Sequence, residues 1–221
     1  MNANLEVTCP TPLIQASSED FLIKPFCKEW PYQNSIIRDD PSSLDPQLLT
    51  DMTRLKEIFE LRVDVWEQSE NCEFVNRRFY PNGWFDELDK TAFHWIITNA
   101  RNEIIAAARL NIFNSLEEFP YYPSMTHLPF PGAMPFAFLS RLIIHPGYRQ
   151  KGLSRKLALA RMLFCKDKNV NWFQVFINHK RIINLFEKMN YANIGQAKVS
   201  YHQFSKPHSV NVFIKQKQLF K

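Results

Sequence analysis

The stretch Arg149-Gln150-Lys151-Gly152-Leu153-Ser154 separates a strand-like apolar run, residues 137–144, from an amphipathic segment that begins near Leu153. The first backbone N–H groups of a helix have no partner within the helix, and the helix dipole adds partial positive charge at the same end. Gly152 has no Cβ, so a ligand can approach the backbone closely. The stretch therefore predicts a cradle for a pyrophosphate group. The alternative is a basic loop that only caps a surface helix, because short motifs often occur by chance.

Cationic side chains surround the same turn. They belong to Arg149, Lys151, Arg155 and Lys156. A ligand that carries several phosphate charges would pair with them, so we expect all four to contribute to binding.

Three segments, in this order, resemble the GNAT acyltransferase superfamily. Residues 138–146 (Phe-Leu-Ser-Arg-Leu-Ile-Ile-His-Pro) resemble the fourth strand of that family, and residues 149–154 resemble its R-x-x-G-x-(G/A) acyl-CoA motif. Residues 184–191 (Asn-Leu-Phe-Glu-Lys-Met-Asn-Tyr) resemble its LYEKxGF segment. Ser154 stands where the motif has Gly or Ala. The resemblance extends over residues 48–213, which is most of the chain.

The resemblance implies the α/β (α+β) class and a three-layer GNAT-like fold. Its central sheet is mixed and mostly antiparallel, with a parallel βαβ unit that binds acyl-CoA. In this chain the unit consists of the strand at residues 137–144, a helix at residues 153–168 and a strand at residues 172–177. A right-handed crossover makes the two strands parallel, and ligands gather beyond the carboxyl ends of such strands.

Hydrophobic periodicity predicts the other elements. Apolar residues recur at three- and four-residue spacing over residues 45–67, which predicts an amphipathic helix with Arg62 on its apolar stripe. Alternation over residues 93–98 and 103–113 predicts a hairpin. We further expect a first strand at residues 35–38, a helix at residues 179–189, and closing strands at residues 195–205 and 210–215.

The composition fits one globular domain. With 221 residues, 45% of them hydrophobic and 14% aromatic, the chain can bury a substantial core. We assign residues 35–221 to a GNAT-like acyltransferase domain and residues 1–34 to an N-terminal arm or cover. There is no apolar run of membrane-spanning length and no signal-peptide pattern at the N-terminus, so we expect a cytoplasmic protein.

Charge and cysteine content exclude some classes of function. The net charge is +5, but acidic and basic residues are interspersed and no nucleic-acid module is recognisable, so we expect no nucleic-acid partner. The cysteines are far apart: Cys9, Cys27, Cys72 and Cys165. Free thiols are therefore expected rather than disulfides or a metal site.

The resemblance also implies the residues that contact the co-substrate, acetyl-CoA or another acyl-CoA, without a metal. The oxyanion donors of the family are backbone N–H groups of the fourth strand. With the turn, the expected acyl-CoA contacts are Leu142, Ile143, Ile144, Arg149, Gln150, Lys151, Gly152, Leu153, Ser154 and Arg155.

A second similarity concerns the acceptor. A predicted helix with Arg and Trp, an Asp-x-x-Asp pair, a hairpin Arg and a Ser-Arg pair occur in the order found in acyl-homoserine-lactone synthases and related N-acyl amino acid synthases. The residues that carry it are Arg62, Trp66, Asp86, Asp89, Arg109, Ser140 and Arg141, and we treat them as candidate substrate contacts. Those relatives have Glu where this chain has Phe138. The alternative is an ion-pair cluster that holds the hairpin to the first helix.

The family chemistry, direct attack of an amine on the thioester, needs a proton for the leaving thiolate. The family often uses the Tyr of LYEKxGF, and this chain has Phe186 there. His94 and a water chain are two possible substitutes. The other candidate acids and bases are Glu117, Glu118, His127, His145 and Tyr191.

The long segment at residues 114–135 is expected to be a lid over the acceptor. Its aromatic residues, with the one that follows, would wall an apolar pocket. They are Phe119, Tyr121, Tyr122, Phe130 and Phe136.

These observations favour a CoA-dependent N-acyltransferase, in the first place an N-acetyltransferase. A lysine with a pKa of about 10.4 costs about 4.6 kcal/mol to deprotonate at pH 7, against about 1.4 kcal/mol for an α-amine with a pKa of about 8. Without an evident base, a small amino-acid-like amine is the favoured acceptor. Two alternatives are a non-catalytic acyl-CoA-binding or sensing protein and an N-acyl amino acid synthase whose donor is a long-chain acyl carrier protein. The basic surface would suit an acidic carrier protein. The sequence leaves the oligomeric state open.

Overall fold

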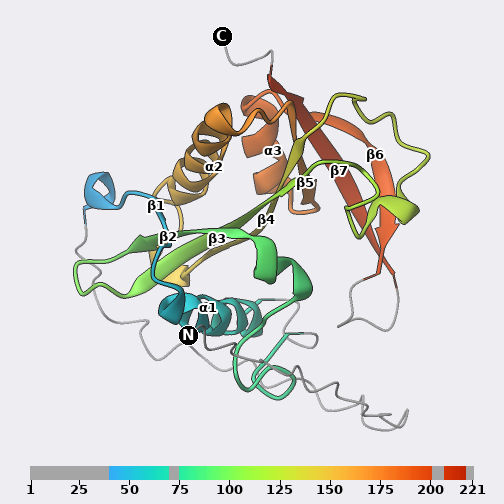
Figure 1. Ribbon diagram of the computed structural model, residues 1–221. Coiled ribbons are helices and arrows are strands. Elements are labelled where there is room, and N and C mark those ends of the chain that lie inside the picture. Colours follow the sequence, from blue (N-terminus) through green and yellow to red (C-terminus); the bar gives the residue numbers. More distant parts are fainter. Residues whose placement is uncertain (1–39, 70–74, 201–206, 218–221) are drawn as a thin grey trace, which may run out of the picture.

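The computed structural model describes residues 40–69, 75–200 and 207–217. Several sequence predictions lie outside these residues: those for the arm, the strand at residues 35–38, Cys9, Cys27 and Cys72. In the described part, one sheet separates the helices into two layers (Figure 1).

The sheet has seven strands in the described residues, in the order β1-β2-β3-β4-β5-β7-β6. They are β1 Gln47–Leu48, β2 Phe93–Thr98, β3 Ile104–Phe113, β4 Phe136–Ile144, β5 Trp172–Ile177, β6 Ala192–Val199 and β7 His208–Gln216. Neighbours are antiparallel except β4 and β5, which are parallel.

The helices cover both faces of the sheet (Figure 1). α2 (Leu153–Phe164) connects β4 to β5 and lies with α3 (Lys180–Lys188) on one face, and α1 (Leu55–Glu67) lies on the other. The predicted α/β class, the three layers and the parallel βαβ unit are confirmed.

Some predicted boundaries are wrong. The helix expected from residue 45 begins at Leu55, because Gln47–Leu48 pairs with the edge of β2. The Asp51 carboxylate then accepts the Thr53 N–H at 3.0 Å and starts a 3₁₀ turn ahead of the helix. α2 ends at Phe164, with a 3₁₀ turn after it. The strand expected at residues 195–205 is β6, which runs from Ala192 to Val199, and the end of that prediction, residues 201–205, lies outside the described residues.

The two parallel strands are paired over only part of their length. Their ladder runs from Phe136 with Trp172 to Leu139 with Val175. β4 continues to Ile144 and β5 to Ile177, so the strands separate beyond this point. The edge of β4 that faces β5 is therefore free of strand pairing over residues 140–144.

A β-bulge lies on β4 where this separation begins. Arg141 has φ of 50°, and neither Arg141 nor Leu142 has a partner in the β3–β4 register. Leu139 packs with α2 and α3, and after the bulge Leu142 packs on the α2 face while Ile143 packs against α1. The bulge thus shifts the side-chain alternation by one residue and turns Arg141 to the α1 face, the face of Ser140.

The chain before β2 is held against α1 through a tight turn at Gly83. The Gly83 N–H donates to the Tyr80 carbonyl at 3.1 Å, and the Trp84 N–H donates to the Phe59 carbonyl of α1 at 2.9 Å. Gly83 has φ of 94°, and a Cβ there would lie 2.7 Å from the backbone of Phe59. Only glycine fits this contact.

We expect Gly83→Ala to lower the free energy of unfolding by about 3 kcal/mol, since the methyl group adds overpacking to backbone strain. The measurement is denaturant unfolding followed by tryptophan fluorescence. Gly132→Ala is the matched control, because a Cβ at Gly132 meets no heavy atom within 4 Å. Equal stability of the two variants would contradict the assigned close approach.

Candidate functional site

The turn predicted to hold a pyrophosphate connects the end of β4 to the start of α2. Gln150 (φ 66°) and Gly152 (φ 74°) are left-handed, and Leu153 is buried beneath the turn. Within the described ranges, the backbone N–H groups of residues 150–154 meet no acceptor. A Cβ at Gly152 would have nothing within 4 Å, so the turn is open to a ligand. The residues present fit an anionic group such as a pyrophosphate.

One of the four predicted cations is engaged elsewhere. The Lys156 ammonium donates to the carbonyls of Pro41 and Leu44 at 3.0 Å each and lies 2.9 Å from the Asp45 carboxylate. It holds the segment before β1 against α2. The expectation that Lys156 serves the turn is therefore wrong for this structure, because these oxygens already surround its ammonium.

The other three cations remain at the turn. Arg149 and Arg155 are exposed, and the Lys151 ammonium lies 5.2 Å from the Tyr148 ring centroid. The Arg149 Nε makes a long contact of 3.4 Å to the Ile144 carbonyl. These side chains border the same opening as the free N–H groups.

The expected oxyanion region of β4 includes the bulge. Leu142 and Ile144 are half-buried on the α2 face, and Ile143 is buried on the α1 face. Leu142 lies directly after Arg141 and has no ladder partner. The point where β4 separates from β5, the bulge, and the cationic turn after β4 therefore follow one another along the chain.

A buried ion pair lies on the α1 face of the sheet. The Arg62 guanidinium binds the Asp89 carboxylate through two hydrogen bonds of 2.8 Å, and the side chains are 1% and 0% exposed. Burial alone would raise the pKa of Asp89, but Arg62 and Arg109 outweigh burial and hold that pKa well below its ordinary value. Burial lowers the pKa of Arg62.

The pair extends into a larger cluster. The Asp86 carboxylate accepts hydrogen bonds from Arg109 and Arg141, while Arg109 also lies 3.1 Å from Asp89 and donates to the Ser140 hydroxyl at 2.9 Å. Asp86 and Asp89 also cap each other's backbone in a capping box. Burial raises the pKa of Asp86, but Arg141 and Arg109 hold it below its ordinary value.

The predicted acceptor residues thus come together, and they differ in exposure. The Asp86 and Arg141 side chains are 13% and 12% exposed, whereas Arg109 is 1% exposed. Asp86 and Arg141 are therefore the members of the cluster that reach the surface. The buried members support these two from behind.

Aromatic rings border the exposed part of the cluster. The Arg141 guanidinium lies 3.9 Å from the Trp84 ring centroid, close enough for a cation–π contact. The Trp66 ring packs edge-on against the Trp84 ring, with 5.3 Å between the ring centroids. Trp66 therefore supports Trp84 and is not itself a member of the ion-pair cluster. Burial raises the pKa of nearby Tyr80 to about 12.

The candidate acids and bases are dispersed. Glu117 and Glu118 are exposed, and the His127 Nε2 lies 3.0 Å from the Gln196 carbonyl of β6. His145 is half-buried just after β4. Burial, and to a lesser extent the positive charge of Arg149, lower the pKa of His145. His94 is buried, with its Nε2 3.8 Å from Asp89 Oδ1, and burial lowers the pKa of His94 as well.

Tyr191 and Phe186 belong to the core on the α2 and α3 face. Their ring centroids are 4.9 Å apart, and their exposed fractions are 4% and 1%. The Tyr191 hydroxyl has no hydrogen-bond partner among the described residues, and burial raises the pKa of the phenol. This placement makes Tyr191 a core aromatic residue.

The predicted lid packs on the sheet. Phe119 and Phe136 are both 0% exposed, with ring centroids 5.5 Å apart, so these two rings are core residues and line no open pocket. Tyr121, Tyr122 and Phe130 are half-buried in the same cluster. The Tyr122 ring packs against Phe130, which stacks on Trp172 at the start of β5, so Tyr122 is a packing residue and not a wall of the expected acceptor pocket. Phe138, which stands where the acyl-homoserine-lactone synthases have Glu, is buried, and its ring centroid lies 5.0 Å from that of Phe119.

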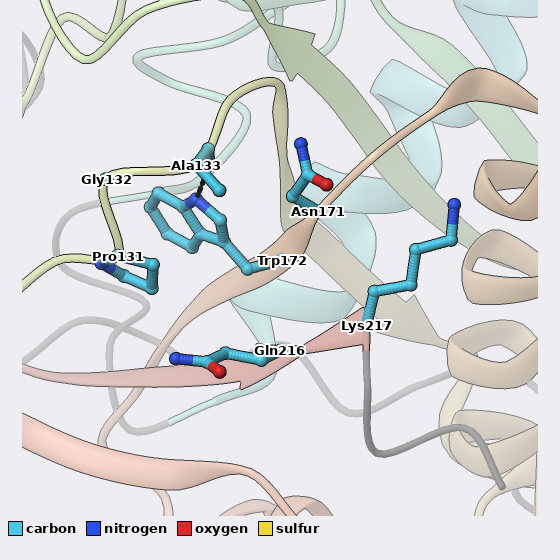
Figure 2. A pocket seen from close by; sticks show the side chains of 7 residues that line it. All are labelled: Pro131, Gly132, Ala133, Asn171, Trp172, Gln216 and Lys217. Carbon is cyan, nitrogen blue, oxygen red and sulfur yellow. Dashed lines mark hydrogen bonds between the residues drawn. The ribbon is translucent and has the colours of Figure 1, made fainter.

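A hollow of 390 Å³ lies where the last part of this segment, just before β4, meets the start of β5 and the end of β7 (Figure 2). The Trp172 indole N–H donates to the Ala133 carbonyl at 2.7 Å within it. Because this hollow is at the amino ends of the parallel strands, it is separate from the Gly152 turn at their carboxyl end.

Sequence reasoning missed Arg161 of α2. Its guanidinium is 1% exposed and donates to the carbonyls of Leu157 at 3.1 Å and of Arg109 at 2.9 Å. The signal was present, since Arg161 follows Leu153 and Leu157 on the apolar stripe of the helix. Trp84 was missed as well, and the sequence carries no comparable signal for it.

Two features are absent from residues 40–69, 75–200 and 207–217. Within them, no three His, Cys, Asp or Glu side chains are arranged to hold a metal ion. No helix in the same ranges has the length and apolar character needed to cross a membrane. Cys165 is a buried free thiol.

Comparison with known proteins places the chain in a family. Residues 55–191 match the model of the acetyltransferase (GNAT) family, so the chain belongs to that family. No curated protein sequence matches it.

Solved structures show the same fold. The CoA-dependent acyl-homoserine lactone synthase BjaI is 15% identical, with 79% of this chain and 85% of that chain covered and a TM-score of 0.57. Arabidopsis thaliana NAA60 in complex with acetyl-CoA is 12% identical, with 80% of this chain and 99% of that chain covered and a TM-score of 0.57. Arylalkylamine N-acetyltransferase 2 from Aedes aegypti is 9% identical, with 79% of this chain and 99% of that chain covered and a TM-score of 0.59.

We expect Asp89→Asn to lower the free energy of unfolding by about 3–5 kcal/mol, because it leaves the Arg62 guanidinium buried without its charge partner. The pKa of Asp89 is depressed in the folded state, so its contribution is complete above the unfolded pKa near 3.9 and is lost as the pH falls further. Unfolding curves between pH 7 and pH 3 should show a weaker acid dependence in the variant. Lys56→Ala, which removes an exposed pair with Glu60, is the control and should change stability little.

Proposed function

We propose that the protein transfers an acyl group from acyl-CoA to the primary amine of a small, amino-acid-like acceptor. The proposal depends on one observation: a continuous path leads from the cationic turn, along the unpaired edge of β4, to the bulge. The pyrophosphate would bind the N–H groups of residues 150–154, beside Arg149, Lys151 and Arg155. The acyl end would then lie near Leu142.

Bound acyl-CoA supplies an activated thioester carbonyl, and the chain supplies its surroundings. Negative charge that develops on the carbonyl oxygen needs fixed N–H donors. The bulge supports this role, because Leu142 has no strand partner and lies where β4 and β5 have separated. The attacking amine must be neutral, so an α-amine with a pKa of about 8 is easier to use than a lysine.

The charges of the cluster favour an acceptor that carries a carboxylate. Three guanidinium groups, from Arg62, Arg109 and Arg141, share the two carboxylates of Asp86 and Asp89, so three positive and two negative charges leave a net +1. The lowered pKa of nearby His94 keeps its imidazole neutral at neutral pH. An acceptor carboxylate at the partly exposed Arg141 would balance the cluster and bring its α-amine toward β4.

A second candidate function is acyl-CoA binding without catalysis. It is favoured by Phe138 and Phe186, apolar residues that occupy two positions where relatives have proton-handling side chains. A carrier-protein donor remains a further variant of the first proposal, because the exposed cations at the turn would also suit an acidic protein surface.

We expect Gly152→Asp to weaken acetyl-CoA binding at least tenfold, about 1.4 kcal/mol, because a carboxylate enters the anion cradle. The measurement is calorimetric titration with acetyl-CoA. The fold should persist, because a Cβ at Gly152 meets no heavy atom within 4 Å and the left-handed backbone costs Asp, which adopts it more readily than most residues, about 1–2 kcal/mol. Gly132→Asp adds the same charge far from the turn and should bind normally, and Lys151→Ala should lose less than Gly152→Asp. Unchanged affinity in Gly152→Asp would show that the cradle lies elsewhere.

We expect the wild-type protein to release thiol from acetyl-CoA or isopentyl-CoA in the presence of a suitable amine. The panel comprises α-amino acids, S-adenosylmethionine and an arylalkylamine. If no residue acts as a base on the amine, the rate should rise about tenfold per pH unit up to the pKa of the acceptor. Binding of acetyl-CoA without thiol release from any pair would favour the sensing function.

A further inference from the structure

Tyr121 lies over the place where β4 and β5 separate. Its ring centroid is 6.2 Å from that of Phe138 on β4 and 5.7 Å from that of Phe176 on β5. The last paired residues of these strands are Leu139 and Val175. The Tyr121 ring therefore packs against side chains of both strands where their ladder ends.

The same phenol lies beside the ion-pair cluster. Burial raises the pKa of Tyr121, while Arg141 and Arg109 act to lower it and Asp86 and Asp89 act to raise it. The charged groups that act on Tyr121 are thus Asp86 and Arg141 at the exposed end of the cluster, and the buried Arg109 and Asp89 behind them. Tyr121 therefore lies over the end of the β4–β5 ladder and within the electrostatic influence of the cluster.

The position that supplies the proton in many relatives is apolar here. Phe186 is buried against Tyr191 in the core on the opposite face of the sheet, and Tyr191 has its hydroxyl in that core. Tyr121 comes from a different element, the segment between β3 and β4, and reaches the strand separation from the α1 face.

We propose that Tyr121 is the catalytic acid that protonates the departing sulfur of CoA. The inference rests on the proposed acyltransferase function. The amine nitrogen forms a C–N bond with the carbonyl carbon, the C–S bond breaks with its electron pair on sulfur, and the phenol proton passes to that sulfur. The phenolate then takes the surplus proton from the nitrogen, which gives the amide, the free thiol and the original phenol. No other reactant is needed.

The state of the phenol before reaction suits this role. A raised pKa keeps Tyr121 protonated near neutral pH, as an acid must be before it donates. Arg141 stabilises the phenolate during the short time in which it exists.

The test compares Tyr121→Phe with Tyr122→Phe. Both changes remove one hydroxyl from the same segment, but the ring of Tyr122 packs against Phe130, away from the separation of β4 and β5. With acetyl-CoA and the amine of the panel that wild type uses fastest, we expect Tyr121→Phe to lower kcat about 10²-fold. The KM for acetyl-CoA and the thermal unfolding midpoint should stay close to wild type, and Tyr122→Phe should leave kcat unchanged.

A second measurement separates proton transfer from packing. Replacing Tyr121 by a ring-fluorinated tyrosine, whose phenol ionises nearer neutral pH, should make the rate fall at high pH from a lower pH than in wild type. Retained kcat in Tyr121→Phe, an equal loss in Tyr122→Phe, or an unmoved pH profile would each overturn the role of Tyr121 alone. Absence of thiol release by wild type would overturn the acyltransferase function, and the role of Tyr121 with it.

Discussion

The left-handed backbone of Arg141 in the middle of β4 is the constraint on which the site depends. A non-glycine residue in this conformation costs about 1–3 kcal/mol and persists only where its surroundings hold it. Here Asp86 binds the side chain and Trp84 stacks beneath it. The bulge places Ser140 and Arg141 on one face, and it lies where β4 loses its pairing with β5. The arrangement of the ion-pair cluster and the free strand edge therefore have a common structural origin.

The opposite face of the bulge is held by a second guanidinium, that of Arg161. It has no carboxylate partner among the described residues, and burial lowers its pKa to about 10. Arg161 instead donates to backbone carbonyls of α2 and β3, and it lies 3.5 Å from the Ser140 carbonyl. Arg62, by contrast, is paired with Asp89. The two arginines show two ways to bury a cation: with an opposite charge, or with several carbonyl dipoles.

The sequence predicted those features that depend on local patterns. The periodicity gave the hairpin, the core of α1 and the βαβ unit, and Arg62 on an apolar stripe indicated a buried partner. Leu48 and Met52 match the helical spacing by chance, which placed the predicted helix start too early. Leu48 instead pairs with β2, and Met52 begins the 3₁₀ turn that Asp51 caps. The bulge was not predictable, since a one-residue change in alternation leaves an apolar strand apolar. The contact of Lys156 with residues 41–45 depends on a long-range approach that local spacing does not encode.

Because sequence patterns encode local structure and not long-range contacts, the residues that handle protons were the hardest to predict from the sequence. Motif positions direct attention to residues 138 and 186, where relatives have proton-handling side chains, and both positions are aromatic core here. The polar groups of the α1 face instead come from five separate parts of the chain: α1, the turn before β2, β3, the bulge of β4, and the segment that follows β3. Tyr121 joins them only because that segment folds back over both parallel strands. When the family's positions for acid and base become apolar, a side chain can supply the same proton from another element, provided that it reaches the thioester from the acceptor's face of the sheet.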